Sequence, residues 1–154
     1  SLDVMRLKKK GTVVSEDKDT SILGKIEMTK LIETDFTVLK PDDNLGVIVE
    51  NIKHSKRNIF PVVNTEQKLL GIITLSSIKE EMFNQELYTK LVASEIMLKP
   101  DVIIKHDEDI FAVMDKFEET GHWNLPVTEK GSYKGFLSKS SLLTEYREQL
   151  LSSI

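Results

Sequence analysis

Two hydroxyl-bearing residues stand where an apolar β run gives way to a helical pattern. Thr74 ends the run Leu69–Thr74, and Ser138 ends the run Tyr133–Ser138. At a helix start, Thr and Ser side chains accept hydrogen bonds from the free backbone N–H groups. The same N–H groups lie at the positive end of the helix dipole and suit phosphate or hydroxyl oxygens. These positions therefore predict helix caps or, with further groups around them, anion sites.

The sequence gives little indication of catalysis or metal binding. It has no Gly-x-Ser-x-Gly elbow, no Gly-x-x-x-x-Gly-Lys-Ser/Thr phosphate loop and no Gly-x-Gly-x-x-Gly fingerprint. The absence of cysteine removes disulfides, thiolate metal sites and thiol catalysis. His54, His106 and His122 do not have the spacing of metal ligands. We therefore expect no catalytic residues, no metal site and no enzymatic activity.

Composition bounds the class of protein. The chain has 154 residues, of which 40% are hydrophobic, which is enough for a packed core. Its formal net charge of −4 argues against a nucleic acid polymer as a partner. The longest apolar stretch, around Leu69–Leu75, is far shorter than the ~20 residues that span a bilayer. Because the chain begins with Ser1-Leu2 and not methionine, we expect a water-soluble piece of a larger protein.

An internal repeat organises the chain. A shift of 65 positions places Val38–Lys40 on Ile103–Lys105 and Pro61 on Pro126. A helical i, i+3, i+4, i+7 stripe occurs in both copies. Its members are Leu45, Ile48, Val49 and Ile52 in the first copy and Ile110, Val113, Met114 and Phe117 in the second. After one residue is dropped in a turn, the match continues with Gly71–Thr74 on Gly135–Ser138 and Ser76–Ile78 on Ser140–Leu142.

Each copy predicts the element order β-α-β-β-α, with a short helix before it. In the first copy the expected elements are Thr37–Leu39, Asn44–His54, Ile59–Val63, Leu69–Thr74 and Leu75–Asn84, preceded by a helix near Gly24–Glu33. In the second they are Val102–Ile104, Asp109–Thr120, Asn124–Thr128, Tyr133–Ser138 and Lys139–Leu151, preceded by a helix near Ala93–Met97. A unit of about 60 residues buries only about 60% of its surface and is marginally stable alone. We expect an α/β (α+β) fold of two such units, related by a pseudo-twofold axis.

This pattern resembles the cystathionine-β-synthase (CBS) domain pair, or Bateman module. The resemblance rests on Phe60–Asn64 and Leu70–Ser77 in the first copy and on Leu125–Val127 and Gly135–Ser141 in the second. It covers roughly residues 24–148. It implies a linker over residues 1–23, a first CBS unit over 24–88 and a second over 89–154.

A shorter resemblance concerns prokaryotic ClC-family chloride channels and chloride/proton antiporters. Met5–Gly11, Asp17–Asp19 and Leu23 look like the segment that joins their last membrane helix to a cytoplasmic CBS pair, and Ser55–Pro61 and Trp123–Pro126 look like the same branch. Basic residues after a membrane helix favour the cytoplasmic side. The resemblance implies a regulatory module at the cytoplasmic face of the cell membrane, a transmembrane ClC-type domain in the same polypeptide, and a homodimer.

The CBS resemblance also implies adenine-nucleotide binding, with AMP, ADP or ATP as the candidate ligands. Backbone amides near Val38 and Ile103 would read the purine edge, and Phe60, Leu125 or Trp123 would form an apolar wall. The candidate nucleotide-binding residues are Val38, Phe60, Pro61, Thr74, Ser77, Ile103, Leu125, Pro126, Ser138 and Ser141. Lys56 and Arg57 are candidates to face phosphate or a membrane surface, or simply to offset a helix dipole.

Two positions depart from the family pattern and leave nucleotide binding open. The ribose-binding aspartate of the family falls on Ser77 and Ser141, so both copies lack its carboxylate. The alternatives are a ligand-free dimerisation scaffold, in which the two helical stripes lie between subunits, and a regulatory module of another transporter or of a metabolic enzyme. Ser77→Asp is expected to tighten nucleotide binding in a sensor and to have no effect in a scaffold.

Overall fold

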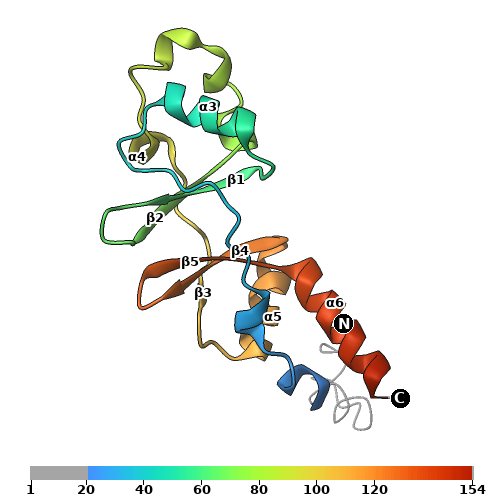
Figure 1. The fold of residues 1–154 in the computed structure, drawn as a ribbon. Helices are drawn as coiled ribbons and strands as arrows, with labels where there is room; N and C mark the ends of the chain where they lie inside the picture. The colour runs from blue at the N-terminus through green and yellow to red at the C-terminus, as the bar shows by residue number, and fades with distance from the viewer. Residues whose placement is uncertain (1–20, 154) are drawn as a thin grey trace. The chain divides into compact units, whose positions relative to one another are not determined.

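The computed structural model describes residues 21–153, which form two compact units. Unit 2 contains Thr34–Asp101 and Thr128–Gly135, and unit 1 contains the described residues of 1–33 together with Val102–Val127 and the described residues from Phe136 onward. The basic segment Met5–Gly11 and Asp17–Asp19 lie outside the described residues. The predicted mixed α/β architecture of two repeats is confirmed (Figure 1).

Unit 2 is built on an antiparallel pair of strands. Strands β1 (Ile59–Val63) and β2 (Leu69–Thr74) pair with Phe60 opposite Ile73 and Val62 opposite Gly71. Leu39 adds a parallel bridge to Val62, because Leu39 N donates to Pro61 O at 2.8 Å and Val63 N donates to Leu39 O at 2.9 Å. Both strands have the bounds that the apolar runs predict.

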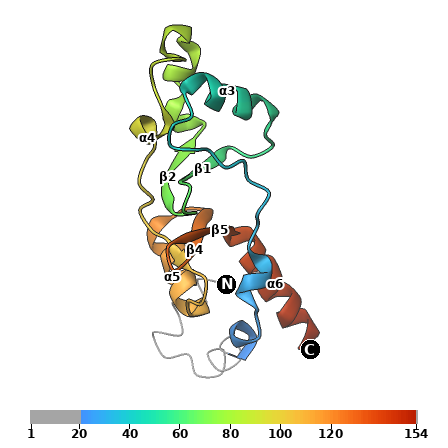
Figure 2. The same ribbon diagram turned by 60° about the vertical axis from the view of Figure 1, so that its left-hand side comes forward.

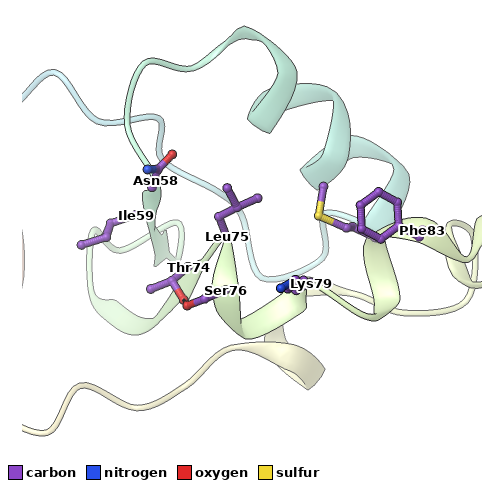
Figure 3. Close-up of a pocket in the computed structure, with 8 residues that line it drawn as sticks. Asn58, Ile59, Thr74, Leu75, Ser76, Lys79 and Phe83 are labelled. Atoms are coloured by element: carbon purple, nitrogen blue, oxygen red, sulfur yellow. Dashed lines mark hydrogen bonds between the residues drawn. The ribbon is translucent and has the colours of Figure 1, made fainter.

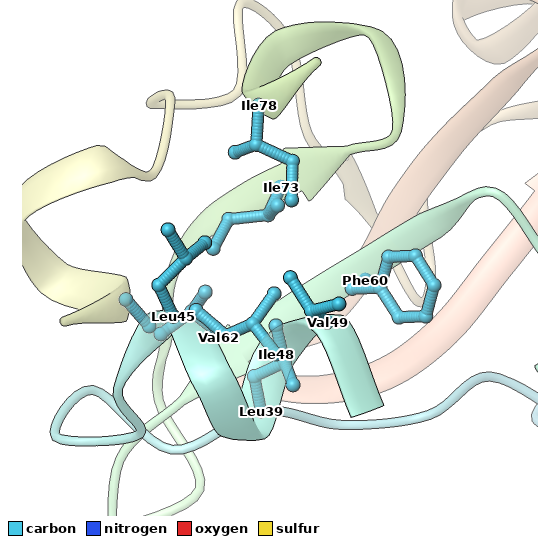
Figure 4. Packing of buried hydrophobic residues seen from close by; sticks show 9 residues of the cluster. Leu39, Leu45, Ile48, Val49, Phe60, Val62, Ile73 and Ile78 are labelled. Carbon is cyan, nitrogen blue, oxygen red and sulfur yellow. The ribbon is translucent and has the colours of Figure 1, made fainter. Parts of the chain in front are cut away.

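Helix α3 (Leu45–His54) covers this sheet with its predicted stripe. Asn44 caps it by accepting a hydrogen bond from Val47 N at 2.9 Å. The core of unit 2 consists of Leu39, Leu45, Ile48, Val49, Phe60, Val62, Ile73, Ile78 and Ala93 (Figure 4). Because Leu45, Ile48 and Val49 are at most 5% exposed, they are buried within the unit. The scaffold hypothesis placed them between subunits, and on this point it is wrong.

Unit 1 repeats this plan. The second sheet has the order β3-β4-β5, formed by β3 (Ile104–Lys105), β4 (Asn124–Glu129) and β5 (Ser132–Ser138). The end of β4 and the start of β5 fall within Thr128–Gly135 and so belong to unit 2. Helix α5 (Ile110–Thr120) buries Val113, Met114 and Phe117, and Asp109 caps it through Phe111 N at 2.7 Å. Helix α6 (Lys139–Ser152) follows β5 and packs against the short 3-10 helix η1 (Met28–Leu31) (Figure 2).

The segment that leads into each repeat packs in the unit of the other repeat. Glu33 precedes the first repeat, yet it exchanges two backbone hydrogen bonds with Phe136 on β5, at 2.8 and 3.0 Å. Leu98 precedes the second repeat and exchanges two with Ile72 on β2, both at 2.8 Å. Glu33 and Leu98 are 65 positions apart, so the exchange follows the repeat. The pseudo-twofold axis itself stays a prediction.

One predicted helix is wrong. Residues Leu75–Asn84 form two 3-10 segments, η2 (Ser76–Ile78) and η3 (Glu81–Phe83), and not a continuous α-helix. The backbone at Leu75, Lys79 and Glu80 keeps right-handed helical angles, so only the hydrogen bonding differs. The Ser77 hydroxyl donates to Thr74 O and so competes for a backbone group that a regular helix needs. The next segments are η4 (Gln85–Leu87) and α4 (Ala93–Ile96).

Gly71 on β2 makes room for the exchanged segment. A β-carbon at this position would lie 2.5 Å from Met97 Sδ and 2.9 Å from Met97 Cβ. The absent side chain therefore lets Met97 pack beside the strand next to the Leu98 bridge. At Gly24, by contrast, a β-carbon would meet nothing within 4 Å.

We expect Gly71→Ala to lower the free energy of unfolding by about 1–3 kcal/mol, because the added methyl group overpacks the contact with Met97. Urea denaturation measures the change. Gly24→Ala is the matched control, and it should leave stability unchanged or raise it by up to about 1 kcal/mol because this glycine lies in a helical turn. Equal effects of the two substitutions would contradict the close approach at Gly71.

Candidate functional site

The junction after β2 is held by a ring of local hydrogen bonds. Ser77 N donates to Thr74 Oγ1 at 3.1 Å, which is the hydrogen bond expected of a cap, although the 3-10 helix that follows has Leu75 and not Thr74 at its N-cap position. Thr74 N donates to Ser77 Oγ at 3.0 Å, and Ser77 Oγ donates to Thr74 O at 2.9 Å. Thr74 Oγ1 also lies 3.1 Å from Ser76 Oγ. The hydroxyl of Ser77 is therefore engaged within its own turn.

The junction after β5 has the same backbone plan with different neighbours. Ser141 N donates to Ser138 Oγ at 3.1 Å, so Ser138 caps α6 as predicted. Ser141 Oγ donates to Glu33 Oε1 at 3.1 Å. The segment that contains Glu33 therefore brings a carboxylate to Ser141. Leu98, which has the repeat position of Glu33, carries no carboxylate.

A pocket of about 630 Å³ opens beside Thr74 in unit 2. Its volume falls within the range of small-molecule sites. It is lined by Asn58, Ile59, Thr74, Leu75, Ser76, Lys79, Met82 and Phe83. Asn58 and Ile59 lie at one end and Phe83 at the other, with Leu75 between them (Figure 3). We call this cavity the Thr74 pocket.

The lining of the Thr74 pocket divides into an apolar wall and a small polar group. Ile59, Leu75, Met82 and Phe83 supply the apolar wall, and the Phe83 side chain is 79% exposed. The hydroxyls of Thr74 and Ser76, the amide of Asn58 and the ammonium of Lys79 supply the polar groups. An apolar pocket with a few convergent polar groups is the usual form of a small-molecule site.

Among the predicted site residues of the first repeat, only Thr74 lines this pocket. Phe60 is fully buried in the core, and Pro61 is buried on β1, so the apolar wall does not come from Phe60. Val38 is 46% exposed and lines a second cavity of about 580 Å³ with Lys40, Asn64 and other residues of unit 2. The structure therefore does not gather these residues around one pocket.

The predicted residues of the second repeat are mostly engaged in the fold. Leu125 is 2% exposed and Pro126 is buried on β4, so neither forms an accessible wall. The carbonyl of Ile103 accepts a hydrogen bond from Lys116 Nζ at 2.8 Å. Lys116 also pairs with Glu108 at 2.7 Å, where both side chains are partly buried. A ligand-binding role for Ile103, Ser138 and Ser141 stays a prediction.

Arg57 is held in an ion pair. Its guanidinium donates to both carboxylate oxygens of Asp35, at 2.6 and 3.3 Å, and lies 4.4 Å from the centroid of the Phe36 ring. This hydrogen bonding lowers the pKa of the Asp35 carboxyl. Burial, with a smaller contribution from the Asp35 charge, raises the pKa of nearby Tyr133. Lys56 remains exposed, so the predicted pair divides into one paired and one surface cation.

Sequence reasoning missed most of the pocket lining. Leu75, Lys79, Met82 and Phe83 are spaced i, i+4, i+7 and i+8, so one face of the expected helix carried the signal. Asn58 and Ile59 reach the pocket from β1 through the hydrogen bond of Leu75 N to Asn58 O at 3.0 Å. That contact is not local in sequence and leaves no periodic pattern.

Metal and membrane features are absent from the part of the chain that the structure describes. Within residues 21–153, no group of three His, Asp or Glu side chains could hold a metal ion. In the same range, no helix combines the length and the apolar character needed to cross a bilayer.

The chain belongs to the CBS domain family. The family model matches twice, over residues 23–84 and 93–148. A search of curated proteins finds no significant match. The class of the protein is therefore a tandem CBS pair, and CBS domains act as regulatory modules.

Solved structures share this fold at low sequence identity. A CBS domain protein from Streptococcus pneumoniae TIGR4 has a TM-score of 0.74 and 20% identity, over 90% of this chain and 97% of that one. CbpB in complex with c-di-AMP has a TM-score of 0.73 and 17% identity, over 88% and 94%. The CBS domain of a CBS-domain-containing membrane protein from Sphaerobacter thermophilus has a TM-score of 0.64 and 20% identity, over 86% and 96%.

We expect Arg57→Ala to raise the pKa of Asp35 toward its ordinary value, because the main cause of its depression is the hydrogen bond from Arg57. The pair stabilises the fold above the pKa of Asp35 in the unfolded chain, and this contribution is lost as the pH falls through the folded-state pKa. An NMR titration of the Asp35 carboxyl carbon measures the shift. Lys56→Ala, at the exposed neighbouring cation, should leave the Asp35 titration unchanged. An unchanged titration in Arg57→Ala would contradict the pairing.

Proposed function

We propose that this CBS pair is a regulatory module that senses adenine nucleotides, and that the Thr74 pocket is the binding site. The observation that carries the proposal is the position of this pocket at the capped strand-to-helix junction of unit 2. The module acts by binding and not by catalysis. AMP, ADP, ATP and c-di-AMP are the candidate ligands, the last because a structural neighbour was solved in complex with it.

The lining supplies a partner for each part of a nucleotide. The apolar side chains Leu75, Met82 and Phe83 suit the faces of a purine. The hydroxyls of Thr74 and Ser76 suit sugar or phosphate oxygens. Lys79 suits the phosphate charge, and it forms no ion pair with the rest of residues 21–153. Since Ser77 is engaged with Thr74, the family's ribose contact has no direct counterpart here.

We expect at least one of AMP, ADP, ATP and c-di-AMP at millimolar concentration to give calorimetric heat and to raise the melting temperature. Lys79→Gln should weaken the affinity roughly tenfold, because it replaces a charge-assisted contact of about 1.5–3 kcal/mol with a neutral one of about 1 kcal/mol. Lys90→Gln changes an exposed lysine of unit 2 outside the pocket and serves as the matched control. No heat and no thermal shift with any of the four would reject nucleotide sensing and favour the ligand-free scaffold.

We also propose that the parent protein is a ClC-type chloride channel or antiporter, with this module as a homodimer at the cytoplasmic face of the membrane. The basic segment Met5–Gly11 supports this parent, and one structural neighbour comes from a membrane protein.

The reading frame upstream of Ser1 should encode about ten hydrophobic segments of ~20 residues each, and light scattering should give the mass of a dimer. An upstream region without such segments would point to another transporter or to a metabolic enzyme.

A further inference from the structure

The two repeats place equivalent residues around the Thr74 pocket and around its counterpart in unit 1. Leu75 N donates to Asn58 O at 3.0 Å, and the residues at the same repeat positions make the same bond, Lys139 N to Trp123 O at 2.9 Å. Both junction hydroxyls accept from the amide three residues later, at 3.1 Å in each unit. The two junctions therefore share these backbone hydrogen bonds, but the segments that follow differ: Ser76–Ile78 and Glu81–Phe83 are short 3-10 helices, whereas Lys139–Ser152 is one α-helix.

At one end, Trp123 and Lys139 occupy the positions of Asn58 and Leu75. The Lys139 ammonium lies 4.7 Å from the centroid of the Trp123 ring. A cation at this distance is attracted to the face of an indole. One face of the Trp123 ring is therefore occupied by a side chain of unit 1 itself, although the Trp123 side chain as a whole is 56% exposed. In unit 2, Asn58 and Leu75 leave the same place open as part of the pocket.

At the other end, the counterparts of Lys79, Met82 and Phe83 are Leu143, Tyr146 and Arg147. Tyr146 is 8% exposed and packs in a core cluster with Ile22, Leu23, Ile26 and Met114. In unit 2 the same position is occupied by Met82, which packs partly buried against the core and still lines the pocket, whereas Tyr146 is almost fully buried in unit 1. The cation at position 79 has also been replaced by a leucine.

If the module binds nucleotides as proposed above, these differences decide how many nucleotides each chain binds. We infer that the module binds one nucleotide per chain, in the Thr74 pocket, and that the Trp123–Lys139 stack and the buried Tyr146 close the equivalent position in unit 1. Both copies thus keep the hydrogen bonds of the junction, and only the first keeps the side chains that would bind a nucleotide. The chain responds to its ligand as a single site, without cooperativity between its repeats.

Calorimetry on the intact chain with its best-binding nucleotide tests the inference. We expect one equivalent per chain. The double substitution Asn58→Trp with Leu75→Lys puts the unit 1 pair into unit 2, and it should abolish binding. The reciprocal control, Trp123→Asn with Lys139→Leu, should leave affinity within about twofold of the wild type, a change of about 0.4 kcal/mol. Melting temperatures of both variants show whether they remain folded.

A second measurement avoids substitutions altogether. Trp123 is the only tryptophan of the chain, so its fluorescence reports on the unit 1 position alone. A base stacked on an indole quenches it, and nucleotide in the Thr74 pocket does not stack there. We expect saturation by calorimetry without static quenching of Trp123.

The outcomes separate the two proposals. Three results would overturn the single-site inference and leave nucleotide sensing intact. The first is binding of two equivalents per chain, and the second is binding of one equivalent that persists in the Asn58→Trp, Leu75→Lys variant. The third is quenching of Trp123 with the affinity that calorimetry gives. No binding of any nucleotide would overturn both.

Discussion

Two pairs of backbone hydrogen bonds tie each repeat to the segment that introduces the other. Glu33 bonds to Phe136 in unit 1, and Leu98 bonds to Ile72 in unit 2. A repeat of about 60 residues is only marginally stable alone, and here each sheet gains an edge contact from outside its own repeat. The exchange also places Met97 against Gly71, and it places the Glu33 carboxylate against Ser141. The exchanged segments therefore supply some of the residues around the two strand-to-helix junctions.

Duplication explains the backbone of the module, and divergence explains its chemistry. Both junctions use a hydroxyl to accept from the amide three residues later, and both helical stripes pack against the core of their own unit. The side chains around the junctions then differ. Unit 2 keeps an accessible pocket with one cation, whereas unit 1 uses the equivalent positions for an indole–ammonium stack and a core tyrosine. The side chains at these positions thus differ between the two units, while both units keep the same order of elements.

Local patterns in the sequence predicted the elements well, because strands and helices impose their own periods on apolar residues. The bounds of β1 and β2 and the buried stripes of α3 and α5 are examples. Features that depend on distant partners were not predictable. The bridge between Glu33 and Phe136 and the ion pair between Asp35 and Arg57 join residues far apart in the sequence, and neither leaves a periodic signal.

The site was predicted least well: Thr74 lines the pocket, whereas Phe60 and Leu125 lie in the cores. Apolar residues beside a junction look alike in sequence whether they line a cavity or fill a core.

The central claim is that a nucleotide binds in unit 2 and leaves the equivalent junction of unit 1 empty. An amide NMR titration of the intact chain with AMP and with c-di-AMP tests it most directly, because each junction has its own resolved backbone signals. The account predicts saturable shifts of the Thr74, Ser76 and Lys79 amides, with those of Ser138, Ser140 and Leu143 little changed. Shifts confined to the second group, or no saturable shift with either nucleotide, would contradict it.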